Sequence, residues 1–304
     1  MDFTLRPMST SEVLDRMFFL YKKNFVLFAG IAVLPAALAL VVRLGQIAVV
    51  GVPTLGRVPS PSALMATVGG ALLILLVLSI GGTLAAAATV YALSMVHLGK
   101  ITSIGDSYKQ VGHFFWRLMG IVGLVILMCG VILLFVALSF FLVPVMPIVG
   151  ILLGLIALGI GLFFMVHFYA RFSFAIPACV LEKVSVIKAL ERSSFLTKGR
   201  TGRMWLVFLL TGLINSALAF AITLPITVTA ILMAAKGRGQ LSLGLAVAAQ
   251  VGQFLASTLS TPIATISIAL LYFDERIRKE AFDLQYMMSA IEEPVQQQAA
   301  AARQ

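Results

Sequence analysis

Residues 118–141 read LMGIVGLVILMCGVILLFVALSFF, an apolar run that contains no charged side chain. An α-helix rises about 1.5 Å per residue, so about 20 apolar residues are enough to cross a hydrocarbon layer of ~30 Å. This run is therefore long enough to be a transmembrane helix. Five other stretches have the same character: residues 25–42, 66–92, 147–170, 205–235 and 241–272.

The composition of the whole chain agrees with this interpretation. Of the 304 residues 61% are apolar and 11% are charged, and the mean hydropathy is +1.06. Soluble domains are about 45–50% apolar and about 25% charged, which excludes a single soluble core. We predict an all-α, polytopic membrane protein with six transmembrane helices. Residues 1–290 would form one membrane domain, and the Gln/Ala-rich segment 291–304 a disordered cytoplasmic tail.

The basic residues are distributed unevenly along the chain. Of the 22 Lys and Arg residues, 18 lie before the first apolar run, between the second and third, between the fourth and fifth, and after the sixth. Positive residues collect on the cytoplasmic side of a membrane, so both termini are predicted to be cytoplasmic. The net charge of +10 would suggest nucleic-acid binding in a soluble protein. Here topology explains it, and no nucleic-acid partner is expected.

Short amphipathic segments precede the first, third and fifth runs. Ser9-Thr10-Ser11-Glu12 has the spacing of a helix capping box, and Ser103-Ile104-Gly105-Asp106 is similar. Residues 189–198 align with residues 13–22 through shared Leu, Arg, Phe, Leu and Lys residues. We therefore predict three hairpins, each preceded by an amphipathic interfacial helix. The alternative is that any short basic helix beside a span has this appearance.

Charged residues follow the sixth run at helical spacing. Such i,i+4 pairs stabilise a helix by a few tenths of a kcal/mol each, so the last span is expected to continue as a helix. Arg276 and Arg278 would then lie within ion-pair reach of acids such as Glu12, Glu182 or Glu191. The i,i+4 pairs are Asp274/Arg278, Glu275/Lys279, Arg276/Glu280 and Lys279/Asp283.

The basic segment between the fourth and fifth runs is a candidate lipid-binding surface. Its Lys and Arg residues alternate with aromatic residues, a combination suited to a leaflet with negative headgroups. Membrane lipids with anionic headgroups on the cytoplasmic side are therefore the expected partners, unless the charges serve topology alone. The candidate contacts are Arg171, Lys183, Lys188, Arg192, Lys198, Arg200 and Arg203.

Polar residues and prolines inside the apolar runs form a second candidate site. Pro225 and Pro262 each free a backbone carbonyl four residues back, which lipid cannot hydrogen-bond. Amide and hydroxyl side chains nearby are expected to form an intramembrane polar network, either at a helix kink or at a transport site. The candidate residues are Asn215, Thr223, Gln250, Gln253 and Thr261.

The sequence contains no recognisable catalytic constellation. His97, His113 and His167 are scattered and lack metal-ligand spacing. Asp and Glu are missing from the six runs, which argues against a carboxylate relay for protons or sodium. We expect no catalytic activity, no metal and no cofactor.

Several segments resemble one protein family, the membrane domain of bacterial glycerophosphoryl diester phosphodiesterases, together with its free-standing relatives. In fused relatives the phosphodiesterase is a separate soluble barrel, for which this chain has no room. The resemblance therefore implies the membrane fold and not the enzyme activity. It is carried by Leu5-Arg6-Pro7 with Glu12-Val13-Leu14-Asp15-Arg16, by Leu98-Gly99-Lys100 with Ser103, by Arg171 with Pro177-Ala178-Cys179-Val180-Leu181-Glu182 and Ala189-Leu190-Glu191-Arg192-Ser193, and by Tyr272-Phe273-Asp274-Glu275-Arg276-Ile277-Arg278-Lys279-Glu280 with Phe282-Asp283-Leu284.

The expected function is that of a non-catalytic protein of the bacterial inner membrane. The resemblance implies a scaffold or accessory module in envelope or lipid biology, with a membrane protein as a further partner. The alternative is a transporter or lipid-handling permease with a site between the repeats. A large hydrated cavity lined by Asn215, Gln250 and Gln253 would favour transport, whereas a dry bundle would favour the scaffold. A membrane-embedded hydrolase would need a cluster of His, Asp and Glu.

Overall fold

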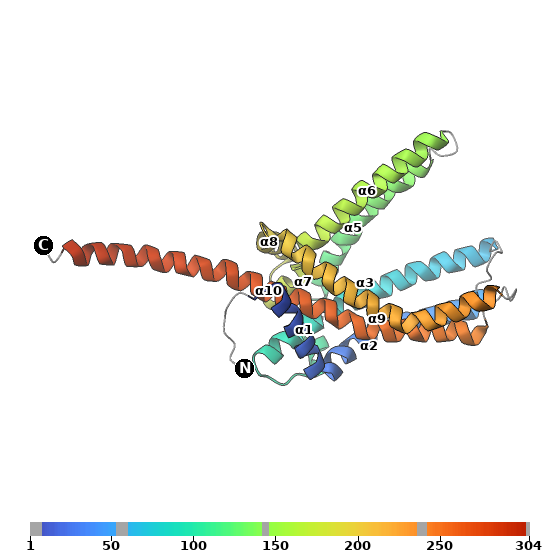
Figure 1. Cartoon of the computed structure of the whole chain (residues 1–304), viewed down its shortest axis with the longest axis horizontal. Coiled ribbons are helices and arrows are strands. Elements are labelled where there is room, and N and C mark those ends of the chain that lie inside the picture. The colour runs from blue at the N-terminus through green and yellow to red at the C-terminus, as the bar shows by residue number, and fades with distance from the viewer. Residues whose placement is uncertain (1–7, 53–59, 142–145, 236–241, 302–304) are drawn as a thin grey trace.

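The computed structural model describes residues 8–52, 60–141, 146–235 and 242–301. All regular structure in these ranges is helical, which confirms the all-α fold class (Figure 1). The helices are α1 (Thr10–Lys23), α2 (Phe25–Val50), α3 (Pro61–His97), α4 (Ile104–Gly112), α5 (Phe115–Phe141), α6 (Pro147–Phe172), α7 (Ala175–Leu181), α8 (Val186–Thr197), α9 (Thr201–Ala235) and α10 (Leu243–Ala301).

The long helices account for the membrane character of the chain. Within the described residues, five helical segments are long and apolar enough to cross a membrane: α2, α3, α6 with α7, α9, and α10 to Glu280. A sixth is reached if α4 and the first part of α5, which meet at an angle of 77°, count as one span. The chain thus has five to six candidate spans, and the predicted count of six requires that bent pair.

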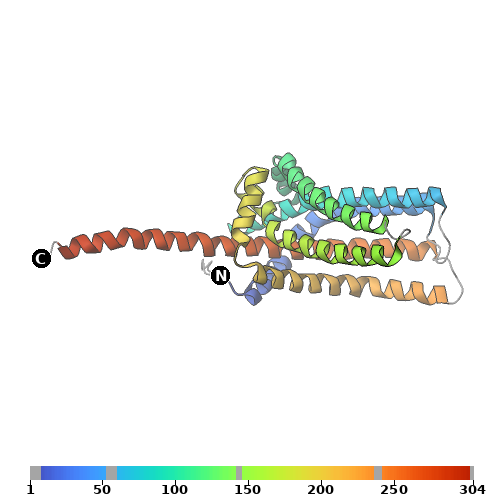
Figure 2. The same cartoon turned by 90° about the horizontal axis from the view of Figure 1, so that it is seen from above.

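Consecutive long helices lie side by side. Helix α2 packs against α3, α5 against α6, and α9 against α10, while α10 also contacts α1, α2, α3 and α8. The α5–α6 pair diverges from the other long helices and meets them at one end (Figure 1). The short helices α1, α4, α7 and α8 gather at that same end (Figures 1 and 2). We call this end of the molecule the charged end, because the ion pairs described below lie there.

Serine residues begin three of the short helices. Ser9 and Glu12 form a capping box, in which the Glu12 N–H donates to Ser9 Oγ (3.3 Å) and the Ser9 N–H to Glu12 Oε2 (2.6 Å). Ser103 Oγ accepts from the Asp106 N–H at 3.1 Å. Ser185 is the N-cap of α8, although its side chain makes no capping bond. The two predicted caps are confirmed, and each satisfies backbone donors that a helix start leaves free.

The three capped helices share one burial pattern. In each, the side chains four, eight and eleven residues after the N-cap serine are buried, which places them on one helical face. Asp15 and Glu191 both lie six residues after their caps, as the sequence alignment predicted. The common register supports a threefold repeat. The buried positions are Val13, Met17 and Leu20 in α1, Ser107, Val111 and Phe114 in and after α4, and Ala189, Ser193 and Leu196 in α8.

Two tyrosines from short helices donate to carbonyls near prolines in the long helices. Pro35 removes the N–H that would bond the Ile31 carbonyl, and Tyr108 of α4 donates its hydroxyl there at 2.7 Å. Tyr21 of α1 donates to the Leu259 carbonyl, three residues before Pro262, at 3.0 Å. Burial raises the pKa of Tyr21 to about 12, so its hydroxyl stays protonated and remains a donor.

The Tyr108 hydrogen bond yields a test by double-mutant cycle. Tyr108→Phe should lower the free energy of unfolding by about 1–3 kcal/mol, because the Ile31 carbonyl loses its partner. In a Pro35→Ala background the same change should cost less, since the alanine N–H can bond that carbonyl. Denaturant titration of the four proteins in detergent micelles measures the coupling. Equal costs in both backgrounds would contradict this role for Tyr108.

The C-terminal segment continues the last long helix. Helix α10 runs to Ala301 and extends away from the other helices (Figures 1 and 2), while the disorder expected from residue 291 stays a prediction. Alanine and glutamine have high helix propensity, which favours continuation of an existing helix over its termination. Residues 302–304 lie outside the described part of the chain.

Candidate functional site

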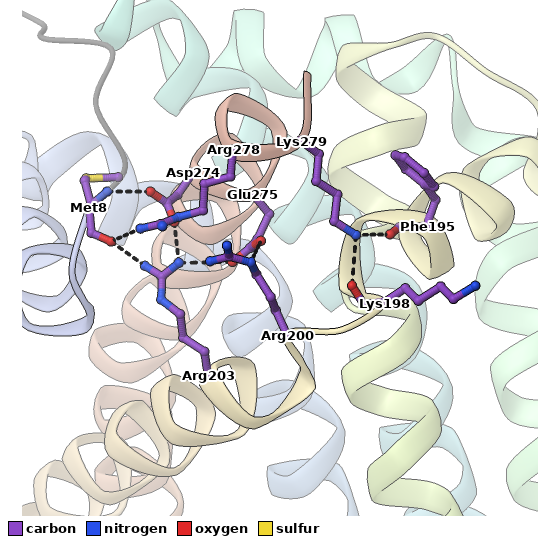
Figure 3. Close-up of polar contacts among 9 residues, drawn as sticks. All are labelled: Met8, Phe195, Lys198, Arg200, Arg203, Asp274, Glu275, Arg278 and Lys279. Atoms are coloured by element: carbon purple, nitrogen blue, oxygen red, sulfur yellow. Dashed lines mark hydrogen bonds and ion pairs between the residues drawn. The ribbon is translucent and has the colours of Figure 1, made fainter. Parts of the chain in front are cut away.

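Two adjacent carboxylates on α10 are fully buried at the charged end. Asp274 and Glu275 are both 0% exposed, and the Arg203 side chain of α9 is 17% exposed. Arg203 Nη1 pairs with Asp274 Oδ2 and, at 3.0 Å, with Glu275 Oε1 (Figure 3). A buried carboxylate is costly unless it is paired and hydrogen-bonded. Arg203 thus compensates both acids from the neighbouring helix.

The same group of side chains holds the backbone of Met8, immediately before the α1 cap. The Met8 N–H donates to Asp274 Oδ1 at 2.6 Å, and its carbonyl accepts from Arg203 Nη2 at 2.7 Å and Arg278 Nη2 at 2.5 Å. Arg278 Nε also donates to Asp274 Oδ2 at 2.8 Å. We call Met8, Arg203, Asp274, Glu275 and Arg278 the hub (Figure 3). The hub joins the start of α1, the start of α9 and the middle of α10.

One oxygen of Glu275 lacks a hydrogen bond. Glu275 Oε2 is buried and has no hydrogen-bond partner, although it forms an ion pair with Arg200, whose Nε lies 3.7 Å away. Arg200 is half exposed, so solvent screens its charge, and at this distance it does not donate a hydrogen bond to the carboxylate. Glu275 is therefore compensated by two arginines, Arg203 at 3.0 Å and Arg200 at 3.7 Å.

A second group of charges joins α7, α8 and α10. Arg192 Nε donates to both oxygens of Glu182 at 2.9 and 3.1 Å, and Arg192 also pairs with Glu280. Tyr272 donates its hydroxyl hydrogen to Glu182 Oε1 at 2.5 Å, and its ring packs edge-on against Phe174.

A neutral side chain, Ser193 of α8, bridges the break between α6 and α7. Its hydroxyl donates to the Arg171 carbonyl at 2.7 Å and accepts from the Phe174 N–H at 3.1 Å.

Lys279 of α10 stabilises the end of α8. Its Nζ donates to the carbonyls of Phe195 and, at 3.0 Å, Lys198, and lies 4.9 Å from the centre of the Phe195 ring (Figure 3). The last carbonyls of a helix carry partial negative charge and have no intrahelical partners, so a cation there is favourable. This contact fixes the turn that follows α8.

The predicted lipid contacts divide into two sets. Arg192 and Arg203 pair with acids inside the protein, whereas Arg200 lies near Glu275 and is 43% exposed; their contact with lipid stays a prediction. The physical reason is that the buried Asp274 and Glu275 and the partly buried Glu182 compete for these arginines with solvent and lipid. Arg171, Lys183, Lys188 and Lys198 are exposed.

An open groove lies between α6, α8 and the start of α9. Its volume is about 490 Å³. Gly199, with φ of +83°, makes the tight turn from α8 to α9 beside it, a backbone conformation that favours glycine. The groove is lined by His167, Arg171, Glu191, Ser194, Phe195, Thr197, Lys198, Gly199 and Thr201.

The predicted intramembrane network is not joined by hydrogen bonds within the described residues. Thr223 and Thr261 donate to the Ala219 and Ser257 carbonyls of their own helices. Gln250 instead accepts from Arg43 at 3.4 Å, and the Asn215 Oδ1 atom is buried without a partner. Gln253 and Gln250 line a cavity of only about 60 Å³ between α2, α3 and α10.

The charged continuation of α10 docks on the short helices, but through partners other than those expected. Arg276 pairs with Glu280 and Arg278 with Asp274, as the i,i+4 spacing predicted, and neither pairs with Glu12, Glu182 or Glu191 in the described residues. The predicted Glu275/Lys279 pair is replaced by the contact of Lys279 with α8. The side chain of Asp283 lies outside the described residues.

The sequence analysis missed the backbone of Met8, the role of Tyr272 and that of Lys279. The only local signal in the sequence was a tyrosine two residues before the Asp274-Glu275 pair. Among the described residues, no group of three or more His, Cys, Asp or Glu side chains could hold a metal ion. Asp274 and Glu275, which are adjacent, form ion pairs with arginines, so their oxygens are used within the protein.

Comparison with known proteins identifies a family to which about half of the chain is similar. Residues 148–297 match the family model described as the membrane domain of glycerophosphoryl diester phosphodiesterase. Neither a curated protein nor a solved structure matches significantly. The matched region runs from α6 through α10 and contains the Glu182, Arg203 and Asp274 contacts. The resemblance drawn from the sequence is therefore confirmed at the family level for residues 148–297: this part of the membrane protein is similar to the membrane domain of glycerophosphoryl diester phosphodiesterase.

Proposed function

We propose that this protein is a non-catalytic scaffold or accessory module of the bacterial inner membrane that acts in envelope or lipid biology. The charged end faces the cytoplasm in this proposal, together with both termini, and it contacts the lipid leaflet and a membrane-protein partner. The hub is the observation that carries the proposal. Its buried carboxylates tie α1, α9 and α10 together through Arg203 and Arg278, which suits a rigid platform.

The charge distribution supports the proposed orientation. The short helices at the charged end contain or adjoin most of the Lys and Arg residues that lie between the apolar runs. Cytoplasmic segments of membrane proteins carry such an excess. The same end therefore combines the topological signal and the ion-pair hub.

The cavity between α2, α3 and α10 favours a scaffold over a permease. Ligand pockets measure about 300–1,000 Å³, whereas the cavity that contains Gln250 and Gln253 measures about 60 Å³. Arg43 and Gln250 are hydrogen-bonded to each other there. A transport pathway would need a larger hydrated space at this depth.

The hub also supports a non-catalytic role. A general acid or base must be able to reach a substrate proton. Asp274 is fully buried and bonded to Arg203, Arg278 and the Met8 N–H, so its lone pairs are used within the protein. We propose that no hydrolysis of a glycerophosphodiester will be detected with the purified protein.

Thiol labelling distinguishes the scaffold from the permease. Single cysteines at positions 215 and 253 are introduced after Cys129 and Cys179 are replaced by alanine. A membrane-impermeant maleimide should leave both unlabelled in intact cells and in inside-out vesicles, because a dry bundle gives water no access to them. Efficient labelling of Asn215→Cys or Gln253→Cys would reveal a hydrated pathway and favour the permease.

An exposed position provides the matched control. Lys188→Cys lies on α8 at the charged end and is exposed. It should react in inside-out vesicles and not in intact cells. The reverse pattern would contradict the proposed orientation.

A further inference from the structure

The groove between α6, α8 and α9 has the chemistry of a binding site. Glu191, Ser194, Phe195 and Lys198 line it from α8 and the residue that follows, at spacings of three, four and seven residues, which places them on one helical face. His167 and Arg171 contribute from α6 in the same way, four residues apart. The volume of about 490 Å³ lies within the usual range for small-ligand sites.

The charges of the groove are not used inside the protein. Arg171 donates Nε to Ser194 Oγ at 3.0 Å, which orients the guanidinium and leaves its other donors available. Neither Arg171, Lys198 nor Glu191 has an ion-pair partner in the described part of the chain. Since Glu191 is not within ion-pair distance of either cation, the groove presents separated positive and negative positions.

Such a separation suits a ligand that is itself a zwitterion. A guanidinium and an ammonium are the usual partners of a phosphate, and Arg can donate to two phosphate oxygens at once. A carboxylate is the matching acceptor for a primary ammonium group. The two long helices that border the groove also expose large apolar side chains, Phe163 on α6 and Leu206 and Leu209 on α9. Such side chains would accommodate acyl chains below a headgroup.

We infer that the groove binds the headgroup of a phospholipid that carries both a phosphate and a primary ammonium, as phosphatidylethanolamine does. Arg171 and Lys198 hold the phosphate, and Glu191 accepts from the ammonium. Lys279 positions the site, because its bonds to the Phe195 and Lys198 carbonyls fix the end of α8. The inference rests on the proposed placement of the charged end at a lipid leaflet. It differs from the anionic-lipid surface expected from the sequence, because the groove prefers a headgroup that carries both charges.

Native mass spectrometry of the purified full-length protein tests this inference. The protein in detergent micelles is titrated with phosphatidylethanolamine and, separately, with phosphatidylglycerol, which has the phosphate but no ammonium. The wild type should bind the first about tenfold more tightly, through one additional charge-assisted hydrogen bond. Equal affinity, or preference for phosphatidylglycerol, would overturn the role of Glu191.

Three exposed positions separate the contributions. Glu191→Gln should make the affinities for the two lipids about equal and leave the affinity for phosphatidylglycerol unchanged. Arg171→Gln should weaken the binding of both lipids about tenfold. Lys188→Gln is the matched control, because it removes an exposed cation of α8 outside the groove and should change neither affinity. If Lys188→Gln weakens binding as much as Arg171→Gln, the attraction is general and the groove is not the site. Unchanged thermal unfolding will show that each variant is folded.

The source of the phosphate is tested by competition. Glycerophosphoethanolamine and inorganic phosphate, both soluble, should displace the lipid only at far higher concentration, since they lack acyl chains. If either binds as tightly as the lipid, the ligand is a soluble phosphate compound and the lipid assignment is wrong. The result of the thiol-labelling experiment does not depend on the relative affinities for these lipids. Labelling at position 215 would overturn the scaffold, whereas loss of the lipid preference would overturn only the headgroup site.

Discussion

Replacing Arg203 by methionine should lower the free energy of unfolding by about 3–5 kcal/mol, the cost of removing one partner of a buried ion pair. Methionine keeps much of the aliphatic volume but removes the charge. Asp274 and Glu275 would remain fully buried, and Glu275 would lose its 3.0 Å contact. The measurement is denaturant titration in detergent micelles, followed by circular dichroism.

Arg276 provides the control for this experiment. It also pairs with an acid on α10, Glu280, but their side chains are 42% and 37% exposed. Arg276→Met should therefore cost no more than about 1 kcal/mol. In addition, Glu275→Gln should recover part of the loss in an Arg203→Met background, because it removes one uncompensated charge. If the two substitutions lowered the free energy of unfolding equally, burial of the acids would not be the reason why the hub stabilises the protein.

The second large effect is expected from Phe174→Ala. Phe174 begins the α6–α8 connection, is fully buried and packs against the ring of Tyr272, with ring centres 5.8 Å apart. Truncation of a buried phenylalanine costs about 3–5 kcal/mol through lost apolar burial and a residual cavity. The variant should therefore unfold at clearly lower denaturant concentration than the wild type.

Phe163→Ala is the matched control for Phe174→Ala. Phe163 lies on α6 and is 69% exposed, so no internal cavity forms on truncation. Its stability should remain within about 0.5 kcal/mol of the wild type. A cost at Phe163 similar to that at Phe174 would mean that the α5–α6 surface is packed against something in solution.

The properties that the sequence predicted correctly are those set by neighbouring residues. Uninterrupted apolar runs identify the long helices, because a helix buries its own backbone polar groups and needs only about 20 apolar residues to cross lipid. The capping box at Ser9 and Glu12 was also visible, since its partners lie three residues apart. The family resemblance over residues 148–297 belongs to the same class of local patterns.

The partners inside the charged end were decided by tertiary structure. Arg203 and Asp274 are 71 residues apart, and Tyr108 meets the carbonyl freed by Pro35 from a position 77 residues beyond Ile31. Any of the many basic side chains has the charge needed to pair with Asp274, and no sequence pattern indicates which of them does so. The packing of the helices decides, because a carboxylate that is shielded from water needs a cation within hydrogen-bond distance. Membrane residence therefore follows from the sequence alone, whereas the division of the cations between the hub and the groove follows from how the short helices pack around α10.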